Sequence, residues 1–157
     1  MQIVEREPVA FAPAGAANAK PARYQLIDED GVLLQLPIAV RFNLPVLVGV
    51  NEDQPETKRR DAVHRMMQLM REVGPLGEQI SEVDVHDLSN LAVMLNVDNQ
   101  TVNLLLGDQH FRKRLQNFLK NYPGIRKRLP DARTFDVRIE GQITALEGEP
   151  SGHQTGE

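Results

Sequence analysis

The sequence predicts an α+β domain in which a mainly antiparallel sheet carries two amphipathic helices and the last strand lies at a sheet edge. Short β-rich runs recur along the chain, and two segments of helical periodicity separate them. The final run, residues 134–146, precedes only a polar tail. Within it Phe135 and Val137 alternate with Asp136 and Arg138, which is typical of a sheet with one solvent-exposed face.

Composition limits the classes of function. The chain has 157 residues, of which 41% are apolar and 25% charged, and this fits one globular domain. A net charge of −4 favours neither nucleic acid nor membrane lipid as a partner. The absence of cysteine excludes a disulfide framework and cysteine-based zinc sites. The N-terminus has no signal-peptide pattern, and prolines and an arginine interrupt the most apolar stretch, residues 33–50.

The first elements are expected to be strands. Residues 2–11 predict a strand, and residues 12–22 have the composition of a loop. Apolar runs on both sides of residues 28–31, Asp-Glu-Asp-Gly, predict a hairpin, because glycine tolerates the positive φ of a tight turn. The acidic residues also suggest a calcium loop, but the apolar residues that follow lack the further oxygen ligands such a loop needs. Residues 44–50 predict a short buried strand.

The rest of the chain predicts helix, meander, helix and closing strand. Apolar residues at helical spacing predict a helix that Gly74-Pro75 ends; they are Val63, Met66, Met67, Met70 and Val73. Three strands should follow as an antiparallel meander, at residues 80–87, 91–97 and 101–106. We expect Asp108 to cap a second helix that Pro123-Gly124 ends or breaks, followed by a basic connector over residues 125–133.

No catalytic or metal-binding pattern emerges. The four histidines share no metal-ligand spacing, and the chain contains neither a nucleophile elbow nor a glycine-rich phosphate loop. The strongest charge feature is a basic cluster between Arg112 and Arg133. It suits phosphate, an anionic lipid surface or an acidic partner, although a solvated helix face has the same composition. Nucleic acid is disfavoured because no recognition helix or aromatic stacking platform accompanies the charge.

Several strings in order resemble the FtsQ/DivIB family of bacterial cell-division proteins. They are Val4-Glu-Arg-Glu-Pro-Val-Ala10, Tyr24-Gln-Leu-Ile-Asp-Glu-Asp-Gly-Val32, Leu44-Pro-Val-Leu-Val-Gly49 and Phe135-Asp-Val-Arg138. The resemblance covers about residues 2–146. It implies that residues 1–11 end a POTRA-like segment, that residues 22–147 form the FtsQ-like β domain, and that residues 148–157 are a disordered tail.

The resemblance also implies a location and a role. It implies an extracytoplasmic (periplasmic) domain of a single-pass inner-membrane protein whose membrane anchor is absent from this sequence. The role is that of a non-catalytic divisome scaffold, without cofactor, that binds FtsB/FtsL-like division proteins and supports septum formation. No nucleic-acid partner is expected.

In this family the partner adds a strand to the edge formed by the end of the β domain. On this sequence the resemblance implies that partner binding falls on Arg138, Ile139, Gly141, Gln142, Ile143, Thr144, Ala145 and Leu146. A final strand keeps unpaired N–H and C=O groups that another strand can bind, and we expect Arg138 to contact an acidic partner residue. Glu140-Gly141 is also compatible with a bulge or tight hairpin, which would shorten the docking edge to residues 142–146.

Two other functions remain open from sequence. An envelope-associated enzyme acting on peptidoglycan predicts a concave pocket with convergent carboxylates or a metal. An anionic-surface binder that uses the basic cluster of residues 112–133 predicts binding to acidic lipid or nucleic acid that salt weakens.

Overall fold

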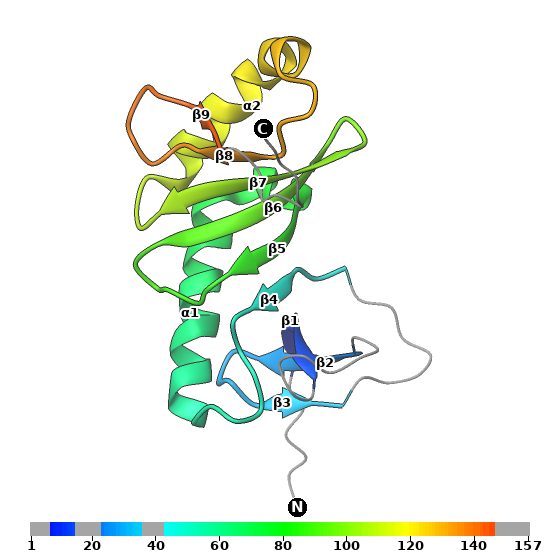
Figure 1. Cartoon of the computed structure of the whole chain (residues 1–157). Coiled ribbons are helices and arrows are strands. Elements are labelled where there is room, and N and C mark those ends of the chain that lie inside the picture. The colour runs from blue at the N-terminus through cyan, green and yellow to red at the C-terminus, as the bar shows by residue number, and fades with distance from the viewer. Residues whose placement is uncertain (1–6, 15–22, 36–42, 147–157) are drawn as a thin grey trace, which may run out of the picture.

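The chain folds around one long sheet with two helices packed on it. The computed structural model describes residues 7–14, 23–35 and 43–146, and Figure 1 shows the arrangement of the elements. Within these residues nine strands follow the spatial order β3-β2-β1-β4-β5-β6-β7-β8-β9. The bounds are β1 Pro8–Ala14, β2 Arg23–Asp28, β3 Leu33–Leu34, β4 Val46–Val48, α1 Glu56–Val73, a 3₁₀ helix η1 Gly74–Gln79, β5 Ile80–Asp84, β6 Leu91–Val97, β7 Gln100–Gly107, α2 Phe111–Arg128, β8 Thr134–Asp136 and β9 Thr144–Ala145.

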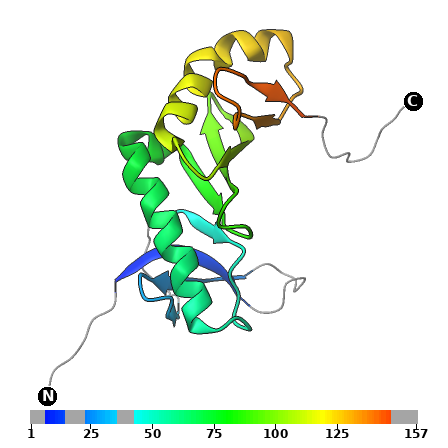
Figure 2. The same ribbon diagram turned by 90° about the vertical axis from the view of Figure 1, so that its left-hand side faces the viewer.

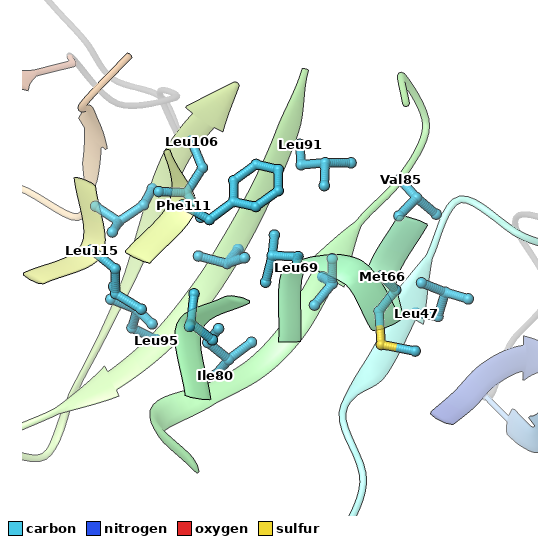
Figure 3. Close-up of a cluster of buried hydrophobic side chains, with 14 of the residues drawn as sticks. Leu47, Met66, Leu69, Ile80, Val85, Leu91, Leu95, Leu106, Phe111 and Leu115 are labelled. Atoms are coloured by element: carbon cyan, nitrogen blue, oxygen red, sulfur yellow. The ribbon is translucent and has the colours of Figure 1, made fainter. Parts of the chain in front are cut away.

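Both helices lie on the same side of the sheet (Figure 2). Side chains along a strand point alternately to the two faces, and in β6 every second residue, from Leu91 to Val97, is buried. These residues meet the apolar stripes of α1 and α2, and Figure 3 shows Leu69, Leu95 and Phe111 within this core. The core is therefore a layer between the helices and one face of the sheet.

The α+β class is confirmed, and the prediction of a mainly antiparallel sheet is right in part, because the described sheet is mixed. Five of the strand pairs in the described residues are antiparallel, including the meander β5-β6-β7. Three pairs are parallel: β1 with β4, β4 with β5, and β7 with β8. Two of these parallel pairs arise because α1 connects β4 to β5 and α2 connects β7 to β8, and a helical crossover joins parallel neighbours.

The hairpin predicted around Asp28 and Gly31 is confirmed. Strands β2 and β3 pair antiparallel, with Leu26 opposite Leu34. The buried Asp28 carboxylate accepts hydrogen bonds from the backbone N–H groups of Asp30 and Val32, each at 2.9 Å. Gly31 has φ +83°. The acidic side chain thus closes the turn on itself.

Two predictions about the second helix are wrong. Asp108 does not cap it, because α2 starts after His110, whose backbone is left-handed (φ 57°) and whose side chain makes no capping bond. Pro123 does not end it either, and the helix continues to Arg128, so residues 125–128 belong to the helix rather than to a connector. The buried Tyr122 and Ile125 on either side of the proline pack into the core, which keeps the helix in place past it.

The described residues do not test the predicted domain boundary at residue 11 or the predicted tail at residues 148–157. β1 extends to Ala14 and pairs with β2 along most of its length. Residues 1–6 and 147–157, and most of the loop predicted at residues 12–22, lie outside the described residues. The division into a POTRA-like end and a β domain therefore stays a prediction.

Candidate functional site

The closing ribbon of residues 134–146 is not the single strand that its alternation predicts. β8 spans three residues and β9 two, and a turn separates them. Gly141 adopts φ +75°, and the Gln142 N–H donates to the Ile139 carbonyl at 3.0 Å, which reverses the chain. The alternative of a tight hairpin at Glu140-Gly141 therefore describes this segment better than a smooth strand does.

β8 is anchored firmly. It pairs in parallel with β7, and the Val137 N–H donates to the Leu105 carbonyl at 3.2 Å. Phe135 is fully buried, with its ring centroid 5.2 Å from that of Phe118 and 6.3 Å from that of Tyr122. This aromatic cluster ties the ribbon to α2 and fixes the starting point of the turn.

β9 is held on one side only within the described part of the chain. It pairs antiparallel with β8, where Phe135 lies opposite Ala145 and Asp136 opposite Thr144. The Leu146 N–H donates to the Thr134 carbonyl at 2.8 Å. Because successive backbone groups point to opposite sides of a strand, Thr144 and Leu146 direct their N–H groups toward β8. That of Ala145 therefore points away from it.

Arg138 forms hydrogen bonds with other residues of the chain. Its guanidinium donates to both carboxylate oxygens of Asp136, at 2.8 and 2.7 Å, and to the Asn90 amide oxygen at 3.3 Å. The hydrogen bond from Arg138 holds the pKa of the Asp136 carboxyl below its ordinary value, although partial burial opposes this. The pKa of Arg138 is raised by the same bond. Arg138 thus braces the turn, and a partner carboxylate would have to share it with Asp136.

A trough of about 300 Å³ separates the turn from α2. Its walls are His110, Lys113, Arg114, Gln116, Asn117 and Lys120 on the helix side, and Val137, Ile139, Glu140, Gly141 and Gln142 on the turn side. The lining contains one carboxylate, Glu140, and the Lys113 ammonium donates to it. That bond lowers the pKa of Glu140. The trough is therefore cationic and lacks the convergent carboxylates that the enzyme alternative predicts.

Gly107 sets the approach of two arginines to this region. It has φ +83°, and a Cβ atom there would lie 2.7 Å from the Arg114 guanidinium and 3.3 Å from Cγ of Arg138. Glycine adopts this φ without strain and leaves room for the Arg114 side chain, which donates to the Leu106 carbonyl. The end of β7 thereby brings α2 and the turn together.

The eight residues predicted for partner binding lie close together along the chain but differ in environment. Arg138 to Gln142 form the turn, Ile143 leads into β9, and Leu146 follows it. Ile139 is 62% exposed, which is unusual for a large apolar side chain. The wall that α2 contributes was not predicted from the sequence. The composition of residues 112–133 indicates a basic cluster, but no pattern in the sequence shows that Lys113 faces the turn.

Two further observations concern the described residues as a whole. No group of three or more histidine, cysteine, aspartate or glutamate side chains is placed to hold a metal ion in the residues described. None of the helices described is long and apolar enough to cross a membrane.

Comparison with known proteins gives two matches. Residues 16–138 match the family model described as cell division protein FtsQ/DivIB, C-terminal. The chain is also 30% identical over 149 residues to "Cell division protein FtsQ" of Koribacter versatilis (strain Ellin345), an alignment that covers 91% of this chain and 41% of that protein. This chain therefore spans less than half the length of that relative. The family match ends at Arg138, so most of the turn and β9 lie beyond it.

Proposed function

The chain belongs to the FtsQ/DivIB family of cell-division proteins, and on that premise we propose that it is a non-catalytic divisome scaffold that captures a partner by strand addition at β9. The observation that carries this proposal is the outward direction of the Ala145 N–H group, with β8 as the single described neighbour of β9. An extended peptide can use such an edge to continue a sheet. The partner would be an FtsB/FtsL-like division protein, and the complex would support septum formation.

The residues that line the trough indicate which side chains a partner strand would need. Each backbone hydrogen bond contributes only about 0.5–1.5 kcal/mol net, so strand pairing along a two-residue edge requires additional contacts. Ile139 offers exposed apolar surface at the trough, and Lys113 and Arg114 supply positive charge beside it. A partner segment with an apolar side chain and a carboxylate close to its paired residues would fill both requirements.

Arg138 has a different part in this proposal from that of a free cation. Its carboxylate partner Asp136 already satisfies two of its N–H groups. Its side chain is 40% exposed, which leaves it able to reach an acidic residue while it remains bound to Asp136. The main role that we assign to Arg138 is to hold the turn through Asp136. Contact with a partner carboxylate is its secondary role.

We also propose that the domain works outside the cytoplasmic membrane, as part of a longer membrane-anchored protein. The family supports this location, and the chain covers only 41% of the length of the Koribacter versatilis relative. Protease accessibility of the full-length protein in spheroplasts tests it. Digestion of this domain in intact spheroplasts is expected, and protection until lysis would contradict the location.

The docking edge is tested by Ala145→Pro. Proline removes the outward N–H of residue 145 and leaves the bonds to β8, which residues 144 and 146 make, in place. Ala145→Ser is the matched control because it retains the N–H group. We expect capture of an FtsB-like peptide, measured by calorimetry, to weaken about tenfold or more in Ala145→Pro and to change little in Ala145→Ser.

Folding measurements on Ala145→Pro separate loss of docking from loss of folding. Circular dichroism and the unfolding midpoint of Ala145→Pro should stay close to those of the unmodified chain, since β9 contributes only two paired residues. Equal partner affinity in a folded Ala145→Pro variant would show that β9 is not the docking edge.

A further inference from the structure

In the described residues both helices pack on one face of the sheet (Figure 2), where Leu47, Val83 and Val93 belong to the core. Because side chains alternate between the two faces of a strand, the residues next to these point away from the helices. The register of the strands places ten such residues in two rows across β4 to β8. The first row is Val46, Glu82, Met94, Asn103 and Thr134, and the second is Val48, Asp84, Ala92, Leu105 and Asp136. These two rows are called the helix-free face below.

The helix-free face is hollowed near its centre. A depression of about 260 Å³ is lined by Val48, Glu82, Asp84, Ala92, Val93, Met94, Asn103, Leu105 and Thr134. Ala92 lies opposite Asp84 on one neighbouring strand and opposite Leu105 on the other. The short side chain of Ala92 between these longer ones leaves space above the sheet. The hollow therefore combines an apolar floor with two carboxylates at one side.

The pairing within the sheet does not account for these carboxylates. Glu82 lies between Val46 on β4 and Met94 on β6, and Asp84 lies between apolar residues of the same two strands. On an exposed sheet face, side chains of opposite charge on neighbouring strands stabilise the pairing. None of the ten residues of the helix-free face is a lysine or an arginine. The two acidic residues thus have no cation opposite them in either row.

Both carboxylates can accept a further contact. Glu82 is half-buried, and among the described residues it makes no hydrogen bond or ion pair. Asp84 uses Oδ1 for its contacts with His86, accepting from the backbone N–H at 3.0 Å and lying 2.7 Å from Nδ1. The Asp84 side chain is nevertheless 46% exposed. Because Glu82 and Asp84 are about 7 Å apart along β5, one cationic group placed between them can contact both.

We propose that the helix-free face is a second docking surface, for a basic amphipathic segment of another protein. A lysine or arginine of that segment lies with its aliphatic stem over Ala92 and its charge between Glu82 and Asp84. Apolar side chains beside it cover Met94 and Leu105. The surface lies on β4 to β8, so this inference goes beyond capture of a partner at β9 and does not depend on it.

Charge and composition favour such a segment over two other occupants. Residues 147–157 of this chain contain three glutamates, no lysine or arginine and no large apolar residue, so they match neither the carboxylates nor the apolar floor. A metal ion is disfavoured because the described residues place no group of three or more histidine, aspartate or glutamate side chains around one position. A side-chain cation with apolar neighbours matches both parts of the hollow.

The test uses two variants of the helix-free face. Glu82→Gln/Asp84→Asn removes the charges and keeps the shape, whereas Ala92→Leu fills the hollow and keeps the charges. The matched control is Asp61→Asn/Glu72→Gln on α1, which removes one aspartate and one glutamate charge at exposed positions on the other side of the sheet. Circular dichroism establishes that each variant is folded.

The probe is a short amphipathic peptide of leucine and lysine, and its binding is measured by calorimetry at low salt. A leucine–glutamate peptide and a serine–lysine peptide of the same pattern are the comparisons. We expect each variant of the helix-free face to bind the leucine–lysine peptide about tenfold more weakly than the unmodified chain does. The α1 control is expected to bind within about twofold. Both comparison peptides should bind the unmodified chain at least about tenfold more weakly.

Four outcomes would overturn the proposal. The first is that the leucine–lysine peptide does not bind the unmodified chain. The second is an equal loss in the α1 control, because net charge alone would then explain binding. The third is unchanged binding to Ala92→Leu, because the hollow would then not be used. The fourth is self-association in sedimentation that Glu82→Gln/Asp84→Asn abolishes, which would make a second copy of the chain the occupant.

The same variants separate this surface from the edge at β9. Capture of the FtsB-like peptide by Glu82→Gln/Asp84→Asn and by Ala92→Leu is expected to be unchanged, since neither variant alters β8 or β9. Conversely, Ala145→Pro should bind the leucine–lysine peptide as the unmodified chain does. Failure of one docking surface therefore leaves the result for the other intact.

Discussion

The described sheet ends on each side in a two-residue strand, β3 beside β2 and β9 beside β8, and a turn with a glycine at positive φ leads to each. The two turns differ in what surrounds them. A Cβ atom on Gly31 would lie 2.6 Å from the backbone nitrogen of Arg60 in α1, whereas one on Gly141 would meet nothing within 4 Å. The Arg59 guanidinium also donates to the Gly31 carbonyl at 2.9 Å. One turn is packed into the fold and the other projects from it.

We infer from this difference that the β2–β3 turn contributes to the stability of the fold, whereas the β8–β9 turn exposes side chains to a partner. At the β2–β3 end the acidic residue of the turn is buried, with Asp28 only 3% exposed. At the β8–β9 end the turn exposes Ile139, and its ion pairs lie at the surface. Loops that bind partners are usually drawn from the less stable parts of a structure. Substitutions at the first turn should therefore affect folding, and those at the second should affect binding.

The largest expected effect is that of Gly31→Ala. It combines a positive φ with a clash against the α1 backbone, and we expect it to lower the free energy of unfolding by about 2–5 kcal/mol. Gly141→Ala is the matched change at the β8–β9 turn. There the added Cβ atom meets no neighbour, so only the positive φ is unfavourable, and the change should cost about 1–2 kcal/mol. Urea denaturation measures both. Equal losses of stability would show that the two turns are equally packed, which would contradict the difference described between them.

The next effect is that of Asp28→Ala, which leaves the N–H groups of Asp30 and Val32 without their acceptor. Because these donors are partly buried, leaving them unsatisfied should cost about 1–2 kcal/mol. Asp28→Asn is the control, because its amide oxygen still accepts, and it should lose less. At the other end Asp136→Ala removes a partly exposed ion pair and should cost about 0–1 kcal/mol. A loss at Asp136 as large as that at Asp28 would contradict the assignment of rigidity to the β2–β3 end.

The same contrast explains which parts of the fold could be predicted from the sequence. The Asp28–Gly31 hairpin and the meander were predictable because their signals are local: turn residues lie between apolar runs. The parallel pairs β4–β5 and β7–β8 were not, because the periodicity of a strand does not report which neighbour it joins across a helix. Pro123 was misread because proline disfavours a helix interior, and here the burial of Tyr122 and Ile125 outweighs that preference.

For the candidate site, the sequence indicated the segment but not its shape. The alternation from Phe135 to Glu140 predicts a continuous strand, yet Gly141 turns the chain back, and only the hairpin alternative allowed for this. The trough could not be predicted, because it depends on the distance between α2 and a turn more than twenty residues later in the chain. The docking of a partner at β9 stays a prediction until Ala145→Pro is measured.

The smallest expected effect is a pH dependence at the open turn. The hydrogen bond from Arg138 lowers the pKa of Asp136 in the folded chain, while in the unfolded chain the carboxyl titrates at its ordinary value. The stabilisation is therefore present in full above that ordinary value, at about pH 4. It is lost as the pH falls through the lowered pKa of the folded chain, when the protonated carboxyl no longer pairs with the guanidinium.

Asp136→Asn isolates this contribution from the other carboxyls. The difference in free energy of unfolding between the unmodified chain and Asp136→Asn should be constant from about pH 7 to about pH 5 and should shrink below about pH 4. Denaturation series at each pH measure it. A difference that does not change between pH 6 and pH 3 would show that the Asp136–Arg138 pair does not stabilise the turn. Arg138 would then be free for a partner carboxylate, and the role assigned to it here as the brace of the docking turn would have to be given up.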